Sequence, residues 1–311
     1  MSFAQEVKNE IVKLDISETA MLAQLSAIIR INGSLVFSKG VSLIDIKTEN
    51  AAIARHVFIL VKNKYNITPT LLTKKKVNLN KKNIYIVRID KDVEKILSDL
   101  SISDGHLILN SVPKEYIVDD GENKSAYLRG AFLASGSIND PKTSRYHQEI
   151  TVDDESLAEF IKELMNSYDL NAKVIRRKKG YVVYIKEAEK ISDFLRVINA
   201  SNALLYFEDI RIYRDHKNMT NRLNNCEQAN IEKSMEAAQN QIKNIHLIEE
   251  HIGLNSLDDK LKEAAVLRLR YKDASLKELS EIISKETKTP ITKSGLSHRF
   301  NKIAKIAKRF K

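Results

Sequence analysis

Apolar positions in the first 200 residues follow a pattern that occurs twice, with the second copy 103 positions after the first. Each copy opens with an apolar segment rich in small residues, at 20–31 and at 124–134, and this spacing predicts a helix. Gly33 follows the first of these segments after one residue, Asn32. A glycine just beyond a helix is typical of a left-handed C-cap, so we expect the helix to end there.

The remainder of each copy predicts alternating strands and helices. In the first copy, strands are expected at 41–47, 67–73 and 84–89, and helices at 50–65 and 91–100. In the second copy, strands are expected at 146–152, 171–177 and 181–186, and helices at 154–168 and 187–198. Residues 1–201 are therefore predicted to form one α+β domain of two repeats, about 1–100 and 115–201.

Residues 202–253 predict a helical connector. Apolar residues recur there at roughly helical intervals, and Asn and Arg residues cluster between 218 and 230. Asn is a poor residue for a helix interior, so the cluster indicates a role beyond the helix itself. Two roles stay open, phosphate contacts or packing onto a neighbour, and Asn221 and Arg222 are candidates for secondary DNA contacts.

Residues 254–311 predict a separate all-α domain of three short helices. Ser275 and Glu278 fit a capping box at the start of the second helix. The third helix is expected to begin near Thr292. The positions predicted to be its buried stripe are Leu296, Phe300, Ile303, Ala304 and Ala307. Three helices with a basic last helix favour a helix-turn-helix motif at about 275–308, although the turn before the last helix is longer than the shortest versions.

The charge of the chain concentrates at its C-terminal end. The chain has 311 residues, a formal net charge of +10 and a pI near 9.3. From Thr287 to Lys311 there are eight Lys or Arg residues and no acid. A polyanionic partner is expected, with double-stranded DNA as the first candidate. The alternative is that the last helix is only a solvated amphipathic helix of a bundle. The predicted DNA contacts are Lys293, Ser294, Ser297, His298, Arg299, Asn301, Lys302 and Lys305.

Several classes of protein are excluded by composition. Cys226 is the single cysteine, so a disulfide scaffold and a cysteine-based zinc module are ruled out. No apolar stretch approaches the roughly 20 residues of a membrane helix. The first ten residues carry charges where a signal peptide would be apolar. We therefore expect a cytoplasmic protein with no membrane partner.

The first helix of each repeat carries a nine-residue segment, Leu25–Gly33 or Leu128–Gly136. Both segments resemble the signature of the LAGLIDADG homing endonucleases. The resemblance implies that the two helices pack as a pair. In that family each helix has an acid at the penultimate signature position, and the two acids together hold divalent metals.

Here the two acid positions are Asn32 and Ser135. Hard cations need anionic oxygens, so we expect no metal, no cofactor, no catalytic residue and no enzymatic activity. Displaced metal ligands at Asp45, Asp140 or Asp153 remain the alternative.

The whole chain resembles the WhiA family of bacterial regulators. The similarity rests on Arg30–Leu35, Arg129–Ala134, Asn221–Cys226 and above all Lys293–Arg299, in combination with the two-repeat domain and the helix-turn-helix. The resemblance implies a nucleoid-associated, sequence-specific transcriptional regulator in cell division and chromosome segregation, and in sporulation where the species sporulates.

The resemblance also leaves questions open. Another transcription regulator or RNA polymerase is a further candidate partner. Two alternative functions stay open, a metal-dependent DNA endonuclease with relocated ligands and a protein-interaction scaffold with incidental DNA binding.

Overall fold

The structure is a computed structural model that describes residues 2–38, 41–75, 83–104, 109–143 and 145–310. It divides into two compact units, Met1–Arg214 and Asp215–Lys311. The boundary falls inside one continuous helix, α8 (Ser201–Ile252), so the segment predicted as a helical connector, 202–253, is helical up to Ile252.

The N-terminal unit contains the two predicted repeats. The first repeat comprises α2 (Glu18–Asn32), β1 (Gly33–Ser38), β2 (Val41–Thr48), α3 (Ala51–Tyr65), β3 (Thr70–Lys75), β4 (Asn83–Ile89) and α4 (Val93–Asp99). The second comprises α5 (Gly121–Ser135), β5 (Gly136–Ile138), β6 (Gln148–Val152), α6 (Glu155–Asn166), β7 (Lys173–Arg177), β8 (Gly180–Ile185) and α7 (Ala188–Val197). Helix α1 (Phe3–Ile11) precedes them, and a 3₁₀ turn, Glu115–Ile117, joins them.

The two sheets have the same antiparallel topology, β1-β2-β4-β3 and β5-β6-β8-β7. Gly33 pairs with Ile46, and Gly136 pairs with Ile150. Equivalent residues at the ends of the signature helices, Gly33 and Gly136, are thus 103 positions apart in the sequence, whereas equivalent residues of β2 and β6 are 104 positions apart. One additional residue between β5 and β6 accounts for this difference, which the constant offset did not predict.

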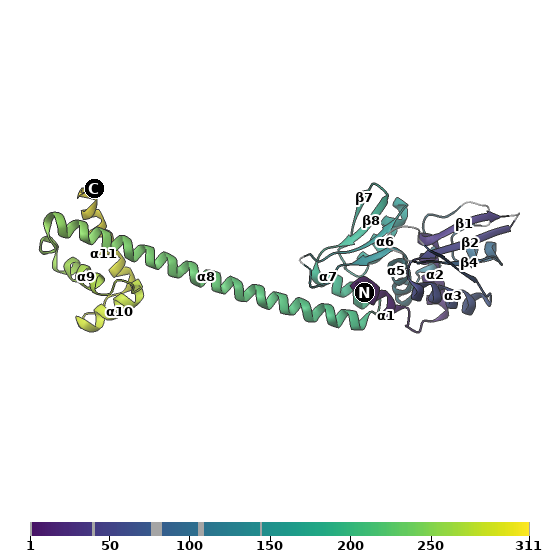
Figure 1. Cartoon of the computed structure of the whole chain (residues 1–311), viewed down its shortest axis with the longest axis horizontal. Coiled ribbons are helices and arrows are strands. Elements are labelled where there is room, and N and C mark those ends of the chain that lie inside the picture. The colour runs from purple at the N-terminus through teal and green to yellow at the C-terminus, as the bar shows by residue number, and fades with distance from the viewer. Residues whose placement is uncertain (1, 39–40, 76–82, 105–108, 144, 311) are drawn as a thin grey trace. The chain divides into compact units, whose positions relative to one another are not determined.

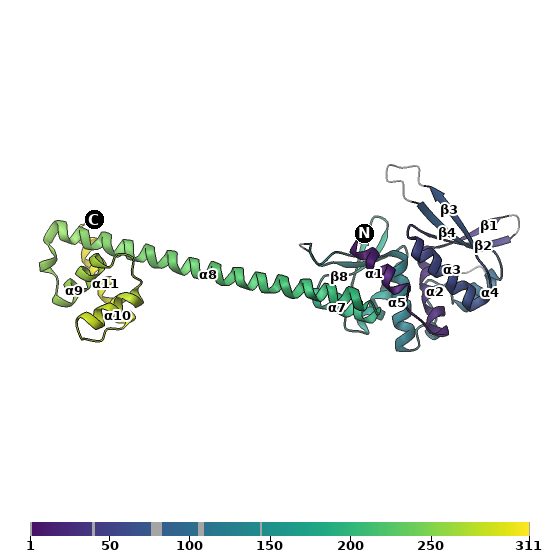
Figure 2. The ribbon, with the colours of Figure 1, turned by 60° about the horizontal axis from the view of Figure 1, so that its bottom comes forward.

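Helices α2 and α5 lie side by side at the centre of the N-terminal unit (Figures 1 and 2). A Cβ atom on Gly130 would lie 2.4 Å from the carbonyl oxygen of Gln24 and 2.9 Å from the Cβ atom of Ala27. Real Cβ atoms do not approach backbone atoms so closely, so glycine is needed where the two backbones meet. The small residues in the signature segments therefore pack one helix onto the other.

Gly33 ends α2 in a different way from the one predicted. Its φ is −76° and its ψ is 145°, which is extended backbone and not a left-handed cap. The chain passes directly from the helix into β1, and a Cβ atom on Gly33 would lie 2.3 Å from the Ile29 carbonyl oxygen. Glycine is therefore needed at this position for space and not for a positive φ.

Helix α1 anchors the start of α8 within the N-terminal unit. The Glu10 carboxylate accepts hydrogen bonds from the backbone amides of Asn202, at 2.7 Å, and Ala203, at 3.0 Å. An acid at a helix N-terminus satisfies free amides and complements the helix dipole.

The C-terminal unit has its own core. Helices α9 (Asp259–Arg270), α10 (Leu276–Glu286) and α11 (Lys293–Ala307) gather against the last part of α8 (Figures 1 and 2). Ile245 and Ile248 of α8 are fully buried in this core. The predicted capping box is present, since the Ser275 hydroxyl accepts from the Glu278 amide and the Glu278 carboxylate accepts from the Ser275 amide. Helix α11 begins after Thr292, as predicted, with Thr292 as its N-cap.

Candidate nucleic-acid interface

The ends of the two signature helices are joined by a hydrogen bond. The Asn32 side-chain amide nitrogen donates to the Ala134 carbonyl oxygen at 2.9 Å, from the last turn of α2 to the last turn of α5. Ser135 occupies the corresponding position on α5, and its buried hydroxyl has no hydrogen-bond partner among the described residues. Asn32 therefore satisfies one of the free carbonyls that every helix C-terminus leaves.

A lysine lies close to the same helix ends. Lys8 of α1 lines a pocket of about 420 Å³ together with Asn32 and Lys47, and its Nζ atom lies 5.5 Å from the centre of the Phe132 ring. Burial lowers the pKa of Lys8 to about 8. Two lysines here supply positive charge where an endonuclease would have carboxylates.

These residues do not fit a divalent metal. Magnesium requires anionic oxygen ligands, and among the residues that line this pocket only Glu49 carries a carboxylate, beside the Asn32 amide and two lysines. Over the ranges that the structure describes, no group of three or more His, Cys, Asp or Glu side chains is placed to hold a metal ion.

Of the aspartates considered as displaced metal ligands, two are hydrogen-bonded to other residues and the third lines a different pocket. Both Asp45 oxygens accept from the Arg88 guanidinium at 2.7 Å, and this hydrogen bonding lowers the pKa of Asp45. Asp140 accepts from the backbone amide of Lys142 at 2.9 Å. Asp153 is exposed at the edge of a different pocket.

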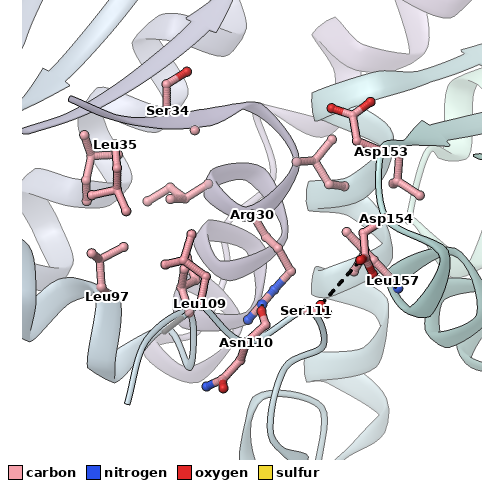
Figure 3. A pocket seen from close by; sticks show the side chains of 16 residues that line it. Arg30, Ser34, Leu35, Leu97, Leu109, Asn110, Ser111, Asp153, Asp154 and Leu157 are labelled. Atoms are coloured by element: carbon pink, nitrogen blue, oxygen red, sulfur yellow. Dashed lines mark hydrogen bonds between the residues drawn. The ribbon is translucent and has the colours of Figure 1, made fainter. Parts of the chain in front are cut away.

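That second pocket, of about 230 Å³, lies between the end of α2 and the start of α6 (Figure 3). Its residues Val152–Asp154 and Leu157 follow Thr48–Asn50 and Ile53 of the first pocket by 104 positions. Arg30 donates to the carbonyl oxygens of Ser101, at 2.8 Å, and Asn110. Asp154 accepts from the Ser111 hydroxyl at 3.4 Å and caps α6 through the Leu157 amide at 2.8 Å. The polar groups of this pocket are therefore largely used by the fold. The repeat symmetry of the backbone does not extend to the chemistry of the two pockets.

Helix α11 presents a different surface. Its buried side is formed by Leu296, Phe300, Ile303 and Ala307, with Ala304 half-buried, which matches the predicted stripe. The residues exposed on its other side are Ser294, His298, Asn301, Lys302 and Lys305. A spacing of three and four residues places these five on one face of the helix. No hydrogen bond or ion pair joins any of their side chains to another described residue.

The other three predicted contacts lie at the margins of this face. Ser297 is half-buried, and Lys293 is exposed beside a groove between α8 and α10. The Arg299 guanidinium points to α9, where it donates to the Lys260 carbonyl oxygen at 3.2 Å and the Glu263 carboxylate at 3.0 Å. Arg299 therefore holds α11 against α9 in this structure.

A buried arginine that the sequence did not single out supports the same face. Arg268 is 1% exposed, and its guanidinium donates to the carbonyl oxygens of Tyr271, at 3.2 Å, and Ala274, at 2.6 Å. The guanidinium carbon also lies 5.5 Å from the centre of the Phe300 ring. Arg268 thus ties the turn before α10 to the buried side of α11.

Asn221 and Arg222 lie on the exposed middle part of α8. The structure does not bring them together with the α11 face into one local site. The basic residues Arg176, Lys178 and Lys179 are exposed where β7 turns into β8, whereas Arg177 contacts Glu149 at 3.3 Å. The sequence has a second basic run, Lys74–Lys76 with Lys81 and Lys82, of which Lys76, Lys81 and Lys82 fall outside the described residues.

The fold and the site define a class of protein, a two-repeat LAGLIDADG-like domain followed by a helix-turn-helix domain. Three family models match the chain, the WhiA N-terminal LAGLIDADG-like domain over residues 18–103, the WhiA LAGLIDADG-like domain over 124–217 and the WhiA C-terminal HTH domain over 220–307. The third match includes the part of α8 that packs into the C-terminal core.

Full-length relatives give the same result. A Bacillus cytotoxicus protein named "Probable cell division protein WhiA" is 50% identical to this chain, over 100% of the chain and 98% of the relative. A Staphylococcus epidermidis protein of the same name is 48% identical, over 99% of the chain and 96% of the relative. The chain belongs to the WhiA family.

A solved structure agrees with this assignment. The crystal structure of full-length DUF199/WhiA from Thermatoga maritima is 25% identical, with a TM-score of 0.60, and the match covers 100% of this chain and 99% of that one. Within the described ranges, no helix combines the length and the apolar character needed to cross a membrane.

Proposed function

We propose that this protein is a sequence-specific DNA-binding transcriptional regulator with no enzymatic activity, acting in cell division and chromosome segregation, and in sporulation where the species sporulates. The observation that carries the proposal is the α11 face, whose five polar or basic side chains are exposed and make no hydrogen bond or ion pair with another described residue, on a helix packed into the C-terminal core. The helix-turn-helix family match supports DNA as the ligand, and the names of the relatives support the process.

The α11 residues divide by chemistry into two groups. Lys302 and Lys305, in the second half of the helix, are suited to phosphate contacts, with Lys293 at its start. Ser294, His298 and Asn301 carry donors and acceptors that can read base edges in the major groove, with Ser297 at their margin. We assign Arg299 a positioning role, because it would have to leave Glu263 to reach DNA.

The N-terminal unit would contribute something other than cleavage. Asn32 and Ser135 supply no anionic oxygen for a metal ion, so this unit would not hydrolyse DNA. Its exposed basic turn at Arg176, Lys178 and Lys179 could add non-specific affinity for DNA, and its surface could contact another regulator or RNA polymerase. A cytoplasmic, nucleoid-associated location follows from these partners.

Selection from a random pool of DNA duplexes tests the proposal. The full chain should enrich a defined sequence, and fluorescence anisotropy should then give tighter binding to that duplex than to a scrambled one. Enrichment of no sequence would favour the interaction scaffold instead. Incubation of the same preparation with supercoiled plasmid and Mg²⁺ or Mn²⁺ should leave the plasmid intact, and metal-dependent cutting would establish the endonuclease.

A further inference from the structure

The pocket at the ends of the signature helices contains two lysines, Lys8 and Lys47. Lys8 is half-buried and Lys47 is exposed, and neither amine forms an ion pair with a carboxylate of the described residues. Burial alone lowers the pKa of Lys8, and no neighbouring acid raises it. A partly buried cation without a counter-ion is costly, so the pocket favours an anionic occupant.

The acids nearest to these lysines do not neutralise them. Glu49 also lines the pocket, but it is exposed and has no effect on the pKa of Lys8. Asp45 lies two residues before Lys47 on β2, and both of its oxygens accept from the Arg88 guanidinium at 2.7 Å. Both amines therefore remain available to a ligand.

Neutral donors line the same pocket. The Thr48 hydroxyl accepts from the Asn50 backbone amide at 3.2 Å, so its own proton is left to donate. The Gln5 side chain, half-buried on α1, makes no hydrogen bond with another described residue. Two amines, a hydroxyl and a carboxamide can thus all donate into one pocket, which suits a ligand group with several acceptor oxygens.

The pocket also has an apolar wall. Ile53, Ile84 and Leu133 line it, and the Lys8 amine lies 5.5 Å from the centre of the Phe132 ring. Its volume of about 420 Å³ falls within the usual range for small-molecule sites. A wall of this kind favours an anion that carries an organic body over a bare inorganic ion.

The cationic character belongs to one repeat only. At the positions 104 residues after Lys47 and Asn50, the second repeat has Thr151 and Asp154. Lys8 comes from α1, which precedes both repeats. The two lysines are therefore not a consequence of the repeated fold, and they require an explanation specific to this pocket.

We propose that this pocket binds a small phosphate monoester, with its phosphate on Lys8 and Lys47 and its organic body against Ile53, Ile84 and Leu133. A phosphate monoester carries a charge of about −1.5 to −2 at pH 7, which matches two ammonium groups, and lysine is a common phosphate ligand. Duplex DNA is a poorer match, because its phosphates form a continuous outer surface and Lys8 lies half-buried in a pocket. The proposal does not depend on the α11 face, which belongs to the other unit.

Titration calorimetry of the full chain with phenyl phosphate and inorganic phosphate provides the first test. Phenyl phosphate should bind more than about tenfold tighter, because its ring buries apolar surface against the wall. Lys8→Met keeps the apolar stem and removes the amine, so it should weaken binding of phenyl phosphate by more than about tenfold. The matched control is Lys13→Met, an exposed lysine just after α1 and outside the pocket, which should leave binding unchanged.

Lys47→Met should also weaken binding, and because this side chain is exposed, the variant keeps the test valid if Lys8→Met fails to fold. Absence of binding to the unmodified chain overturns the proposal. So does equal binding by the two pocket variants and the control. Phenyl phosphate that binds no tighter than inorganic phosphate overturns the assignment of an organic ester.

Labelling of lysines with acetic anhydride, read by mass spectrometry, provides a second test that distinguishes the source of the phosphate. Saturating phenyl phosphate should protect Lys8 from acetylation and leave Lys13 unaffected. A random-sequence duplex at the same total phosphate concentration should leave the labelling of Lys8 unchanged. Protection of Lys8 by the duplex but not by phenyl phosphate would overturn the proposal, and DNA would then be the ligand of this pocket.

Discussion

The ends of the signature helices and the outer face of α11 both carry polar side chains at helix surfaces, but the two regions use them differently. At the signature helices, the Asn32 amide donates a hydrogen bond to the Ala134 carbonyl oxygen of the paired helix. The Arg30 guanidinium donates to the carbonyl oxygens of Ser101 and Asn110. On α11, His298, Asn301 and Lys302 are exposed and bind no described residue. Polar side chains that are hydrogen-bonded within the protein stabilise its fold. Exposed polar side chains that bind no described residue are available to a ligand.

The comparison separates two kinds of effect. Changes at the signature helices should alter the stability of the N-terminal unit and leave sequence preference for DNA intact. Changes on the α11 face should alter DNA binding and leave stability nearly unchanged.

The largest expected effect is at Gly130. Gly130→Leu should destabilise the N-terminal unit by more than about 3 kcal/mol, because even the first added carbon meets the backbone of α2. Gly121→Leu is the matched control, since a Cβ atom there has nothing within 4 Å. Urea unfolding followed by circular dichroism measures both. Equal stability of the two variants would show that the helices do not need the close approach.

Asn32→Asp should restore a signature acid at a cost. The carboxylate cannot donate to the Ala134 carbonyl and faces the negative end of a helix dipole, and its attraction to Lys8 and Lys47 offsets this only in part, so we expect a loss of about 1–2 kcal/mol in the free energy of unfolding. Ser135→Ala removes only an unpartnered hydroxyl and should cost far less. Calorimetry in EDTA measures both variants. A stabilised Asn32→Asp protein would contradict the structural role of Asn32.

His298→Ala and Asn301→Ala should each reduce discrimination between the selected duplex and its base-substituted variants. A lost base-edge contact is worth about 1–3 kcal/mol of discrimination, with little change in affinity for random DNA. Competition anisotropy measures this difference. His216→Ala, which removes an exposed histidine from α8, is the control and should keep the discrimination intact.

The stability of the N-terminal unit should fall in mild acid because of His56. Burial lowers the pKa of His56 to about 4, below the ordinary value of 6.5, so the folded state holds this ring neutral. The unfolded chain therefore binds the proton first, and this contribution is complete above pH 6.5 and is lost as the pH falls toward 4. His56→Leu should flatten the decrease in thermal stability across this range. Parallel pH profiles for the two proteins would contradict the prediction.

The smallest expected effect concerns Arg299. Arg299→Ala and Glu263→Ala should each lower the stability of the C-terminal unit by about 0.5–1 kcal/mol, because they remove the two halves of one partly exposed pair. Both should change DNA affinity only slightly, as anisotropy with the selected duplex would measure. A large loss of affinity for Arg299→Ala alone would show that this side chain turns to DNA.

Much of this architecture could be predicted from sequence patterns. Both repeats, the signature helices, the Ser275–Glu278 capping box and the start of α11 follow from local periodicity and caps, which nearby residues determine. Strands β1 and β5 were missed, because each follows its helix at Gly33 or Gly136 with no intervening turn. Helix α1 is short, and its role emerges only through the contact of Glu10 with α8.

The candidate site was predictable in composition but not in geometry. Periodicity placed His298, Asn301, Lys302 and Lys305 on one face. It could not show that Arg299 pairs with Glu263, which lies 36 positions earlier in the chain. It also missed Arg268, because partners for a buried guanidinium depend on the fold and not on neighbouring residues.

The salt dependence of DNA binding tests the central claim most directly. Affinity of the full chain for the selected duplex is measured across a series of salt concentrations, beside Lys302→Ala/Lys305→Ala and the control Lys217→Ala/Lys243→Ala, which removes two exposed lysines from α8. If α11 lies on the phosphate backbone, the slope of log affinity against log salt should become shallower by about 2 in the α11 variant and stay unchanged in the control. An unchanged slope and affinity in the α11 variant would contradict the account.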